Sequence, residues 1–485
     1  MNYSVGVPMS TWRVARVAAI LTLTFICLSC GDTFRPVAIP ISPPPPDPSS
    51  LHYALVVTVN GADNPGASSR IDVSGDTNVG IAKLGLTPVH AALLPNGARV
   101  YLVNNLEDTV SVYNPSGATG TNAIPVTTVS LAPPGANCTA CPVFVHTTQN
   151  DTVYVANFAN NTVSAISTAN NVVTNTIPVG LNPVALAETP NGNKLYAVSR
   201  GNSSVTSINT IDKTVAKVIA DAGIASPVWA VARADSNRVY VLSAGSGKVS
   251  AIDTFADAVI ASVSVGGGGA NFMLYDKTLN RLYVTNPSAA SLSVIDASSD
   301  TLTVLKTISF AASAAPDAPC PSGCTPASVA ALPDGSRVYV ASYQVNALTC
   351  SQPLTDTPPC ITSQVAVIKA SDNTFIKSIA ITLPDTAPTA PAHSIKPDTA
   401  KLAVCDAATF RLFAVAAADS SRVYVSYCDA GSTAIVRTTP NTSPGSENPG
   451  DFLVLDLPAP VSSSPPPGPG MQPPPQNPVF ILAGP

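Results

Sequence analysis

Cysteine and histidine carry the most specific chemistry in this chain, which contains 10 cysteines and 4 histidines. Apart from Cys27 and Cys30, the cysteines form four close pairs along the sequence. An even number of cysteines is typical of disulfide bonds in an oxidising compartment. The expected local bonds are Cys138–Cys141, Cys320–Cys324, Cys350–Cys360 and Cys405–Cys428.

Metal and haem chemistry are the alternatives for these cysteines. Cys138, Cys141, Cys320 and Cys324 could together bind zinc, but an oxidising compartment favours disulfides. The pattern for attaching a c-type haem requires a histidine after the second cysteine, and Pro142 stands there instead. The sequence therefore predicts no metal site and no cofactor.

Catalytic patterns are sparse. His90 and His146 could act as an acid and a base, but they fall in different repeats and at different depths along their strands. No Gly-x-Ser-x-Gly nucleophile motif occurs, and no helix-like pattern follows the run Gly266 to Gly269, so a phosphate loop is not expected. We predict no catalytic residue from the sequence alone.

The N-terminal segment has the layout of an export signal. Arg13 and Arg16 precede a mostly apolar run, Val17 to Leu28, that is too short for a membrane span. The following Cys30 and its neighbours resemble the lipobox of bacterial lipoproteins, although Cys27 stands where that family prefers Leu. We expect a signal peptide at 1–29 and lipidation of Cys30; a plain signal peptide with an incidental cysteine is the alternative.

The resemblance implies a protein anchored to a membrane by lipid, in the cell envelope. The outer membrane, a periplasm-facing membrane or the cell surface would all fit, since Gly31 follows the cysteine. Residues 30–50 contain a proline-rich tether that is extended and semi-rigid. Only 11% of residues are charged and the net charge is −5, so nucleic acid is not an expected partner.

A sequence repeat organises the chain between residues 51 and 460. The chain repeats one short pattern: a basic or polar residue, an aliphatic residue, a tyrosine and then two residues that favour strands. The central copies, from Tyr154 to Tyr283, are spaced by 42, 44 and 43 residues. The tyrosines of the repeat are Tyr53, Tyr101, Tyr154, Tyr196, Tyr240, Tyr283, Tyr339 and Tyr424.

Each repeat reads as four short antiparallel strands. In the unit 183–219, strands are expected at 183–189, 194–199, 205–209 and 214–219, with a tight turn at Pro190-Asn191-Gly192. Such sheets bury both faces when they stand radially around an axis, which defines a β-propeller and an all-β fold.

The ends of the repeat region determine how such a ring closes. The first unit lacks its innermost strand, and a β-prone run at 479–485 follows a proline-rich crossing segment at 461–478. If that run completes the first blade, the propeller has eight blades. If the terminal units merge, it has seven; we favour eight.

Tyr283-Val284-Thr285-Asn286 spells the name of the YVTN β-propeller repeat family, and the chain resembles that family over residues 51–460. It is more loosely similar to exported seven-bladed propellers grouped with lactonases. The resemblance implies a propeller fold, with ligands at the central funnel.

Position +2 after the lead-in proline of each unit is expected to line that funnel. Five of the seven occupants are aromatic or histidine, which could stack a planar or apolar ligand. The alternative, which we favour, is that these rings pack as core between blades. The occupants are His90, Phe144, Ala185, Trp229, Phe272, Ser328 and Phe413.

Two functional hypotheses remain. The first is a non-catalytic binding or interaction scaffold on the cell envelope, whose ligand is an unknown small molecule, glycan or protein. The second is a lactonase-like hydrolase acting at the central funnel. A hydrolase requires ionisable groups that converge on the funnel, and the innermost strands carry few. We therefore favour the binding hypothesis.

Overall fold

A computed structural model describes residues 53–61, 64–73, 75–117, 123–132, 138–345, 361–381, 412–428, 431–439, 450–458 and 477–484. The signal peptide and tether expected at 1–50, including Cys30, lie outside these residues, as do residues 461–476 of the crossing segment expected at 461–478. All described residues fall in one compact unit, His52–Pro485. The described part of the chain contains no helix with the length and apolarity that a membrane span requires.

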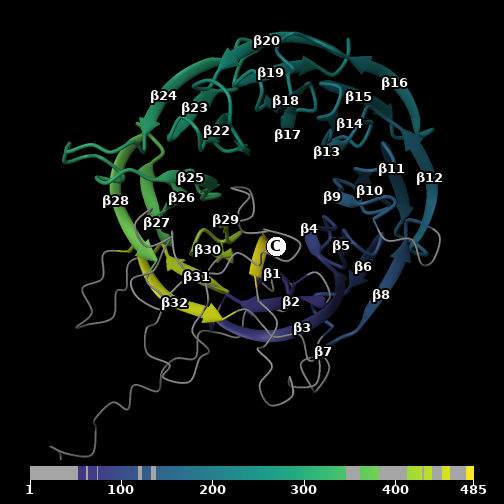
Figure 1. Cartoon of the computed structure of the whole chain (residues 1–485), viewed down its shortest axis with the longest axis horizontal. Coiled ribbons are helices and arrows are strands. Elements are labelled where there is room, and N and C mark those ends of the chain that lie inside the picture. Colours follow the sequence, from purple (N-terminus) through teal and green to yellow (C-terminus); the bar gives the residue numbers. More distant parts are fainter. Residues whose placement is uncertain are drawn as a thin grey trace, which may run out of the picture. The chain divides into compact units, whose positions relative to one another are not determined.

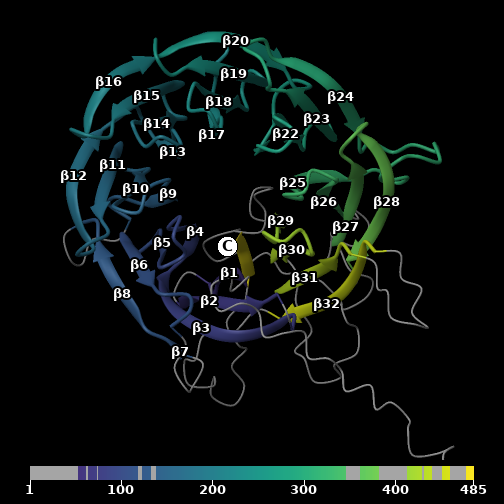
Figure 2. The same cartoon turned by 180° about the vertical axis from the view of Figure 1, so that it is seen from behind.

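Eight antiparallel sheets stand around a central axis and form an eight-bladed β-propeller, as the repeat predicts (Figure 1). In blades 2 to 8 the first strand is innermost and the fourth lies at the rim, which is also clear from behind (Figure 2). Blade 2 consists of β4 (Pro88–Leu93), β5 (Val100–Asn104), β6 (Thr109–Tyr113) and β8 (Val126–Ser130). Blade 3 consists of β9 (Pro142–His146), β10 (Thr152–Asn157), β11 (Thr162–Ser167) and β12 (Val172–Pro178). Blade 4 consists of β13 (Pro183–Glu188), β14 (Lys194–Ser199), β15 (Ser204–Asn209) and β16 (Thr214–Ile219).

The remaining consecutive blades repeat this order. Blade 5 consists of β17 (Pro227–Ala232), β18 (Arg238–Ser243), β19 (Lys248–Asp253) and β20 (Ala258–Ser264). Blade 6 consists of β21 (Phe272–Asp276), β22 (Arg281–Asn286), β23 (Ser291–Asp296) and β24 (Thr303–Ser309). Blade 7 consists of β25 (Thr325–Ala331), β26 (Arg337–Val345), β27 (Ile361–Lys369) and β28 (Thr374–Ile381). Blade 8 consists of β29 (Leu412–Ala416), β30 (Arg422–Tyr427), β31 (Ser432–Arg437) and β32 (Phe452–Pro458).

The two ends of the repeat region share blade 1, which closes the ring. Its innermost strand is β33 (Asn477–Ala483), which pairs antiparallel with β1 (Tyr53–Val59). The sheet continues through β2 (Pro65–Asp72) and β3 (Thr77–Leu86) to a short parallel strand, β7 (Ala123–Ile124). The predicted closing strand is therefore confirmed, and it begins at Asn477.

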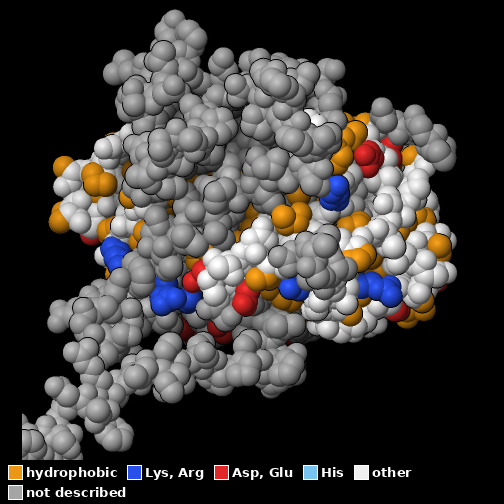
Figure 3. All heavy atoms as spheres, turned by 90° about the horizontal axis from the view of Figure 1, so that it is seen from below, with side chains coloured by type: hydrophobic (Ala, Val, Ile, Leu, Met, Phe, Trp, Pro, Cys, Tyr) orange, Lys and Arg blue, Asp and Glu red, His pale blue; other side chains and the backbone are white. Residues whose placement is uncertain are grey.

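The ring has two distinct faces. We call one the turn face, because it carries the turn between the first two strands of each blade and the turn between the last two. Backbone hydrogen bonds join these turns within a blade, as from Thr210 N to Asn193 O (3.2 Å) and from Thr254 N to Asn237 O (3.1 Å). The opposite loop face carries the remaining connections, including those between blades. Seen from the side, charged groups of both signs are interspersed with apolar ones (Figure 3).

The basic residue and tyrosine of the repeat connect neighbouring blades on the turn face. Lys194 Nζ and the Tyr196 hydroxyl in blade 4 reach the two carboxylate oxygens of Asp257 in blade 5, at 2.7 and 2.5 Å. Burial and the Asp257 carboxylate both raise the pKa of Tyr196. We call this arrangement the inter-blade latch.

Four further blade pairs contain full or partial latches. Each accepting Asp or Asn has positive φ, a conformation that these two residue types tolerate better than most. This explains why the repeat combines a basic residue with a tyrosine two positions later. The contacts are Arg99 and Tyr101 with Asn171, Arg281 with Asn373, Arg337 and Tyr339 with Asp451, and Arg422 with Asp76.

Candidate functional site

The innermost strands bring the predicted funnel residues together in the centre of the ring. His90 stacks on Phe144 with ring centroids 3.9 Å apart, and Phe144 meets Trp229 edge-on at 5.5 Å. Trp229 lies 4.9 Å from Phe272, which lies 5.4 Å from Phe413. These distances are typical of packed aromatic pairs. We call these five residues, with Phe480, the central aromatic cluster.

Phe480 completes this cluster, and the sequence reasoning missed it. Its ring lies 4.3 Å from His90 and 4.5 Å from Phe413, so it joins the two ends of the row. A signal was present, because Asn477-Pro478 has the same form as the lead-in Asn182-Pro183 of the central repeat. Phe480 therefore occupies the eighth +2 position.

The other two +2 positions lie beside this cluster as structural residues. Ser328 is buried, and its hydroxyl accepts a hydrogen bond from Ala414 N at 3.0 Å, which joins blades 7 and 8. Ala185 is also buried, within an apolar core cluster. Phe144, Phe272, Phe413 and Phe480 are each less than 8% exposed, whereas His90 and Trp229 are half-buried. Packing therefore accounts for most of the +2 residues, and a ligand role for them stays a prediction.

Two imidazoles on the innermost strands of blades 2 and 3 are held neutral. Burial lowers the pKa of His90 to about 3, with a smaller contribution from His146, and burial lowers the pKa of His146 to about 4. His90 Nδ1 accepts a hydrogen bond from Val145 N at 3.4 Å. Both side chains are therefore uncharged near neutral pH. Within the described residues, no three His, Cys, Asp or Glu side chains are grouped as metal ligands.

These pKa shifts predict that the ring loses stability as the pH falls. An unfolded histidine binds its proton near pH 6.5, but the folded imidazoles resist protonation until about pH 3 to 4. The unfolded state therefore binds more protons in this interval, so stability is complete above about pH 6.5 and declines below it. By about pH 5 each imidazole should lower the free energy of unfolding by roughly 1–2 kcal/mol.

Urea unfolding midpoints measured from pH 7 downward test this expectation. His90→Phe provides the comparison, because a phenyl ring keeps the contacts with Phe144 and Phe480 but cannot be protonated. The variant should lose less stability than the parent between about pH 6.5 and 5. Parallel curves for the two proteins would show that His90 does not contribute.

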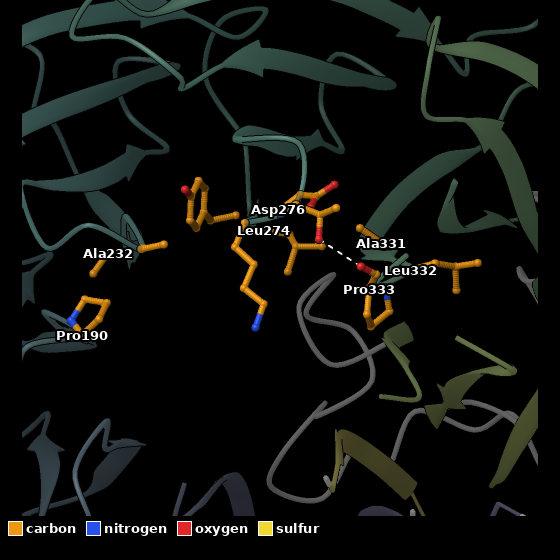
Figure 4. Close-up of a pocket in the computed structure, with 11 residues that line it drawn as sticks. Pro190, Ala232, Leu274, Asp276, Ala331, Leu332 and Pro333 are labelled. Atoms are coloured by element: carbon orange, nitrogen blue, oxygen red, sulfur yellow. Dashed lines mark hydrogen bonds between the residues drawn. The ribbon is translucent and has the colours of Figure 1, made fainter. Parts of the chain in front are cut away.

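A cavity of about 420 Å³ opens on the turn face, where the innermost strands of blades 4 to 7 end. Its walls are mostly apolar. Figure 4 shows Pro190 and Ala232 on one side, Ala331 and Pro333 on the other, and Leu274 between them. A hydrogen bond of 2.9 Å from the Thr278 hydroxyl to Pro333 O connects blades 6 and 7 at the cavity wall. The lining consists of Pro190, Ala232, Ala234, Leu274, Tyr275, Asp276, Lys277, Thr278, Ala331, Leu332 and Pro333.

Two charged side chains line the cavity wall, and one of them is buried while the other is exposed. Asp276 is 6% exposed, and its Oδ1 accepts hydrogen bonds from Thr278 N (2.8 Å) and Leu279 N (3.2 Å). Lys277 is exposed and makes no hydrogen bond or ion pair with any described residue. Lys277 is therefore the charged group that a molecule entering the cavity would meet. This cavity was not predicted from the sequence, because its lining comes from the ends of four strands.

Disulfide bonds lie on the loop face, away from this cavity. Cys138 is bonded to Cys141 and Cys320 to Cys324, which are two of the local pairs expected from the sequence. The Asp108 carboxylate holds the first of these loops by accepting hydrogen bonds from the backbone N–H groups of residues 139–141. Cys428 is also disulfide-bonded. The other expected participants, Cys350, Cys360 and Cys405, lie outside the described residues.

The fold is an eight-bladed β-propeller with a cavity on the turn face. The family model described as "Lactonase, 7-bladed beta-propeller" matches residues 76–229 of this chain. No protein with a curated description matches the sequence.

Solved structures share the fold at low sequence identity. The dihydro-heme d1 dehydrogenase NirN, in complex with DHE, is 13% identical, with a TM-score of 0.53 over 83% of this chain and 73% of that one. The periplasmic gluconolactonase PpgL of Pseudomonas aeruginosa is 15% identical, with a TM-score of 0.48 over 68% of this chain and 95% of that one. A putative 6-phosphogluconolactonase of Bacteroides fragilis is also 15% identical, with a TM-score of 0.48 over 70% and 96%. These similarities concern the fold alone.

Proposed function

We propose that this chain is a non-catalytic binding protein of the bacterial cell envelope, and that it binds a small apolar molecule carrying an anionic group. The observation that carries the proposal is the turn-face cavity. Its volume of about 420 Å³ lies within the usual range for small-molecule sites, which are mainly apolar with a few polar groups. Four blades contribute to its wall, so the closed ring holds the cavity in shape.

The charge of the ligand follows from Lys277. An exposed ammonium group that has no partner among the described residues and lies beside apolar walls favours a carboxylate or a similar anion over a cation. The neighbouring Asp276 carboxylate is 6% exposed; its Oδ1 accepts two hydrogen bonds within its own turn, and its Oδ2 is buried without a hydrogen-bond partner among the described residues. Its burial makes it less accessible than Lys277 to an incoming charged group. Leu274 and the prolines would contact the apolar part.

Location in the envelope is part of the proposal and is supported by the N-terminal sequence. The lipobox-like segment ending at Cys30 would provide a lipid anchor, and the proline-rich tether would hold the propeller away from the bilayer. Labelling cells with radioactive palmitate tests this: the parent chain should be labelled and Cys30→Ala should not. A labelled Cys30→Ala chain would disprove the anchor and leave the cavity proposal standing.

We expect aliphatic and aromatic carboxylic acids to raise the melting temperature of the purified protein more than the corresponding alcohols do. Ligands that bind only the folded state stabilise it in proportion to their concentration over Kd. Lys277→Met should weaken acid binding by roughly three- to tenfold and leave alcohol binding unchanged. Calorimetric titration of the best acid, with its alcohol alongside, measures the difference.

Ala234→Trp is the matched variant for the apolar part of the site. Ala234 is exposed at the cavity wall, so a larger side chain should obstruct the entrance without disturbing the core. This variant should weaken the binding of acids and of alcohols alike, whereas Lys277→Met should weaken the binding of acids alone. Binding that neither variant alters would place the ligand elsewhere and refute the site.

A lactonase-like hydrolase is the second candidate, because a lactonase family model matches residues 76–229. His90 and His146, on the innermost strands β4 and β9, would be the neutral bases of such a site. Acid release from γ- and δ-lactones, followed by titration at constant pH, tests this candidate. A rate above the uncatalysed one that disappears in His146→Asn would favour the hydrolase over the binding protein.

A further inference from the structure

Two large apolar side chains on the turn face are almost completely exposed. Phe255 is 97% exposed and Ile211 is 81% exposed. Single exposed apolar residues are common on protein surfaces, but a nearly bare phenyl ring at the tip of a turn leaves its whole apolar area in water. The other described large apolar side chains with substantial exposure reach at most 56%.

These two residues occupy equivalent places in neighbouring blades. Each stands two positions before a residue of positive φ in the turn between the third and fourth strands, Lys213 in blade 4 and Asp257 in blade 5. The same place holds Ala169 in blade 3, where the positive-φ residue is Asn171, so a large apolar group is not required by the turn.

The turns that carry both side chains are held firmly. Thr210 and Thr254 each bond to the preceding turn of the same blade through the backbone and the hydroxyl. Lys217 Nζ also donates to Ala256 O at 3.1 Å, which links blade 4 to the turn that carries Phe255. The two apolar tips therefore stand on short, hydrogen-bonded turns of adjacent blades rather than on long loops.

The charges around the tips suit a phospholipid surface. Asp257 is paired with Lys194, and Asp253 with Arg238, which also pairs with the exposed Asp300. The remaining charges close in sequence are those of Asp212, Lys213 and Lys217, two of them positive. Apolar tips flanked by lysines are typical of proteins that insert into the headgroup region of a bilayer.

The N-terminal end of the ring lies on the same face. Tyr53 begins β1 and pairs with Asp72, which directly precedes the turn between β2 and β3. A proline-rich chain spans about 3 Å per residue, so the residues between Cys30 and Tyr53 could reach about 70 Å. A lipid on Cys30 would therefore keep the N-terminal end of the ring, which lies on the turn face, within about 70 Å of a membrane.

We infer that Phe255 and Ile211 form a membrane-contacting tip that seats the turn face on a phospholipid bilayer. The inference goes beyond the proposed ligand binding and does not depend on it. Two apolar side chains give weak attachment alone, and a tether adds to it by raising the local concentration. The occupant of this surface is the lipid bilayer.

Vesicle partition of a chain that begins at Gly31 tests the inference. This chain lacks the leader and Cys30 but keeps the compact unit that contains every described strand. It should bind vesicles of phosphatidylethanolamine and phosphatidylglycerol. The double variant Phe255→Ser, Ile211→Ser should lower the partition coefficient at least about tenfold. Each serine removes most of the apolar surface that would pass from water into the bilayer.

Leu181→Ser is the matched control, because Leu181 is 51% exposed but lies in a connection on the loop face. It should bind vesicles like the parent. As a second measurement, Phe255→Trp fluorescence should shift to the blue on adding vesicles and be quenched by brominated lipid, whereas Leu181→Trp fluorescence should not change. A parent that does not partition, or a double variant that partitions equally, would overturn the inference. Self-association of the parent that the double variant lacks, without vesicle binding, would assign the tip to a second copy of the chain.

Discussion

Deleting residues 479–485 should destabilise the whole propeller. Val479, Phe480 and Ile481 are each less than 8% exposed, and burying such side chains stabilises a fold by roughly 1.5–3 kcal/mol each. The deletion also removes the inner partner of β1 and leaves its backbone N–H and C=O groups unpaired. The summed loss, of about 5 kcal/mol or more, is comparable with the entire stability of many domains.

Urea unfolding followed by circular dichroism measures this effect, and the deleted chain should unfold at a much lower midpoint or fail to fold. Leu482→Ala is the appropriate control, because Leu482 belongs to the same strand but is half-buried and should cost far less. An unchanged midpoint for the deletion would mean that the ring is stable without β33.

Replacing Asp76 with Asn should be the most damaging single change at the latches. Arg422 in blade 8 binds Asp76 in blade 1 through Nε (2.9 Å) and Nη2 (3.1 Å), and both side chains are less than 9% exposed. The variant would leave the Arg422 guanidinium buried without its counterion. Removing one member of a buried ion pair typically costs about 3–5 kcal/mol.

Asp257→Asn is the matched comparison for this latch. It also has positive φ, so the backbone requirement is the same, but its partner Lys194 is 26% exposed. Exposed pairs contribute only about 1 kcal/mol or less, so the urea midpoint should fall less than for Asp76→Asn. Adding Arg422→Met to Asp76→Asn should recover part of the loss, because it removes the buried unpaired charge but leaves Arg437, which also faces Asp76 at 3.7 Å. Equal midpoints for the two single variants would contradict the role of burial.

The strands and their order were largely predictable from the sequence. Repeated tyrosines and turn residues placed the four strands of the unit 183–219 almost as the structure has them, because short-range turn chemistry sets those boundaries. The closing strand was predictable for a different reason: the first unit lacked a partner that only the last segment could supply. Both inferences depend on features that are visible in the sequence. These are the local pattern of turn residues and a strand that lacks its partner.

The site was less predictable. Spacing placed His90, Phe144, Trp229, Phe272 and Phe413 in the centre, but spacing does not say whether rings pack against each other or leave room for a ligand. The latches were missed for a related reason, since the tyrosine and its acceptor come from different blades, such as Tyr196 and Asp257, 61 residues apart. Tertiary neighbours of this kind have no fixed offset in the sequence.

The split composition of blade 1 has a consequence for how the protein is made. Its outer strands are synthesised near the beginning of the chain and its innermost strand near the end, so a ribosome releases seven other blades before β33 exists. Until then the nascent chain is an open arc whose first and last blades cannot join. Contacts between residues so far apart form slowly, so closure is a late, post-synthetic event.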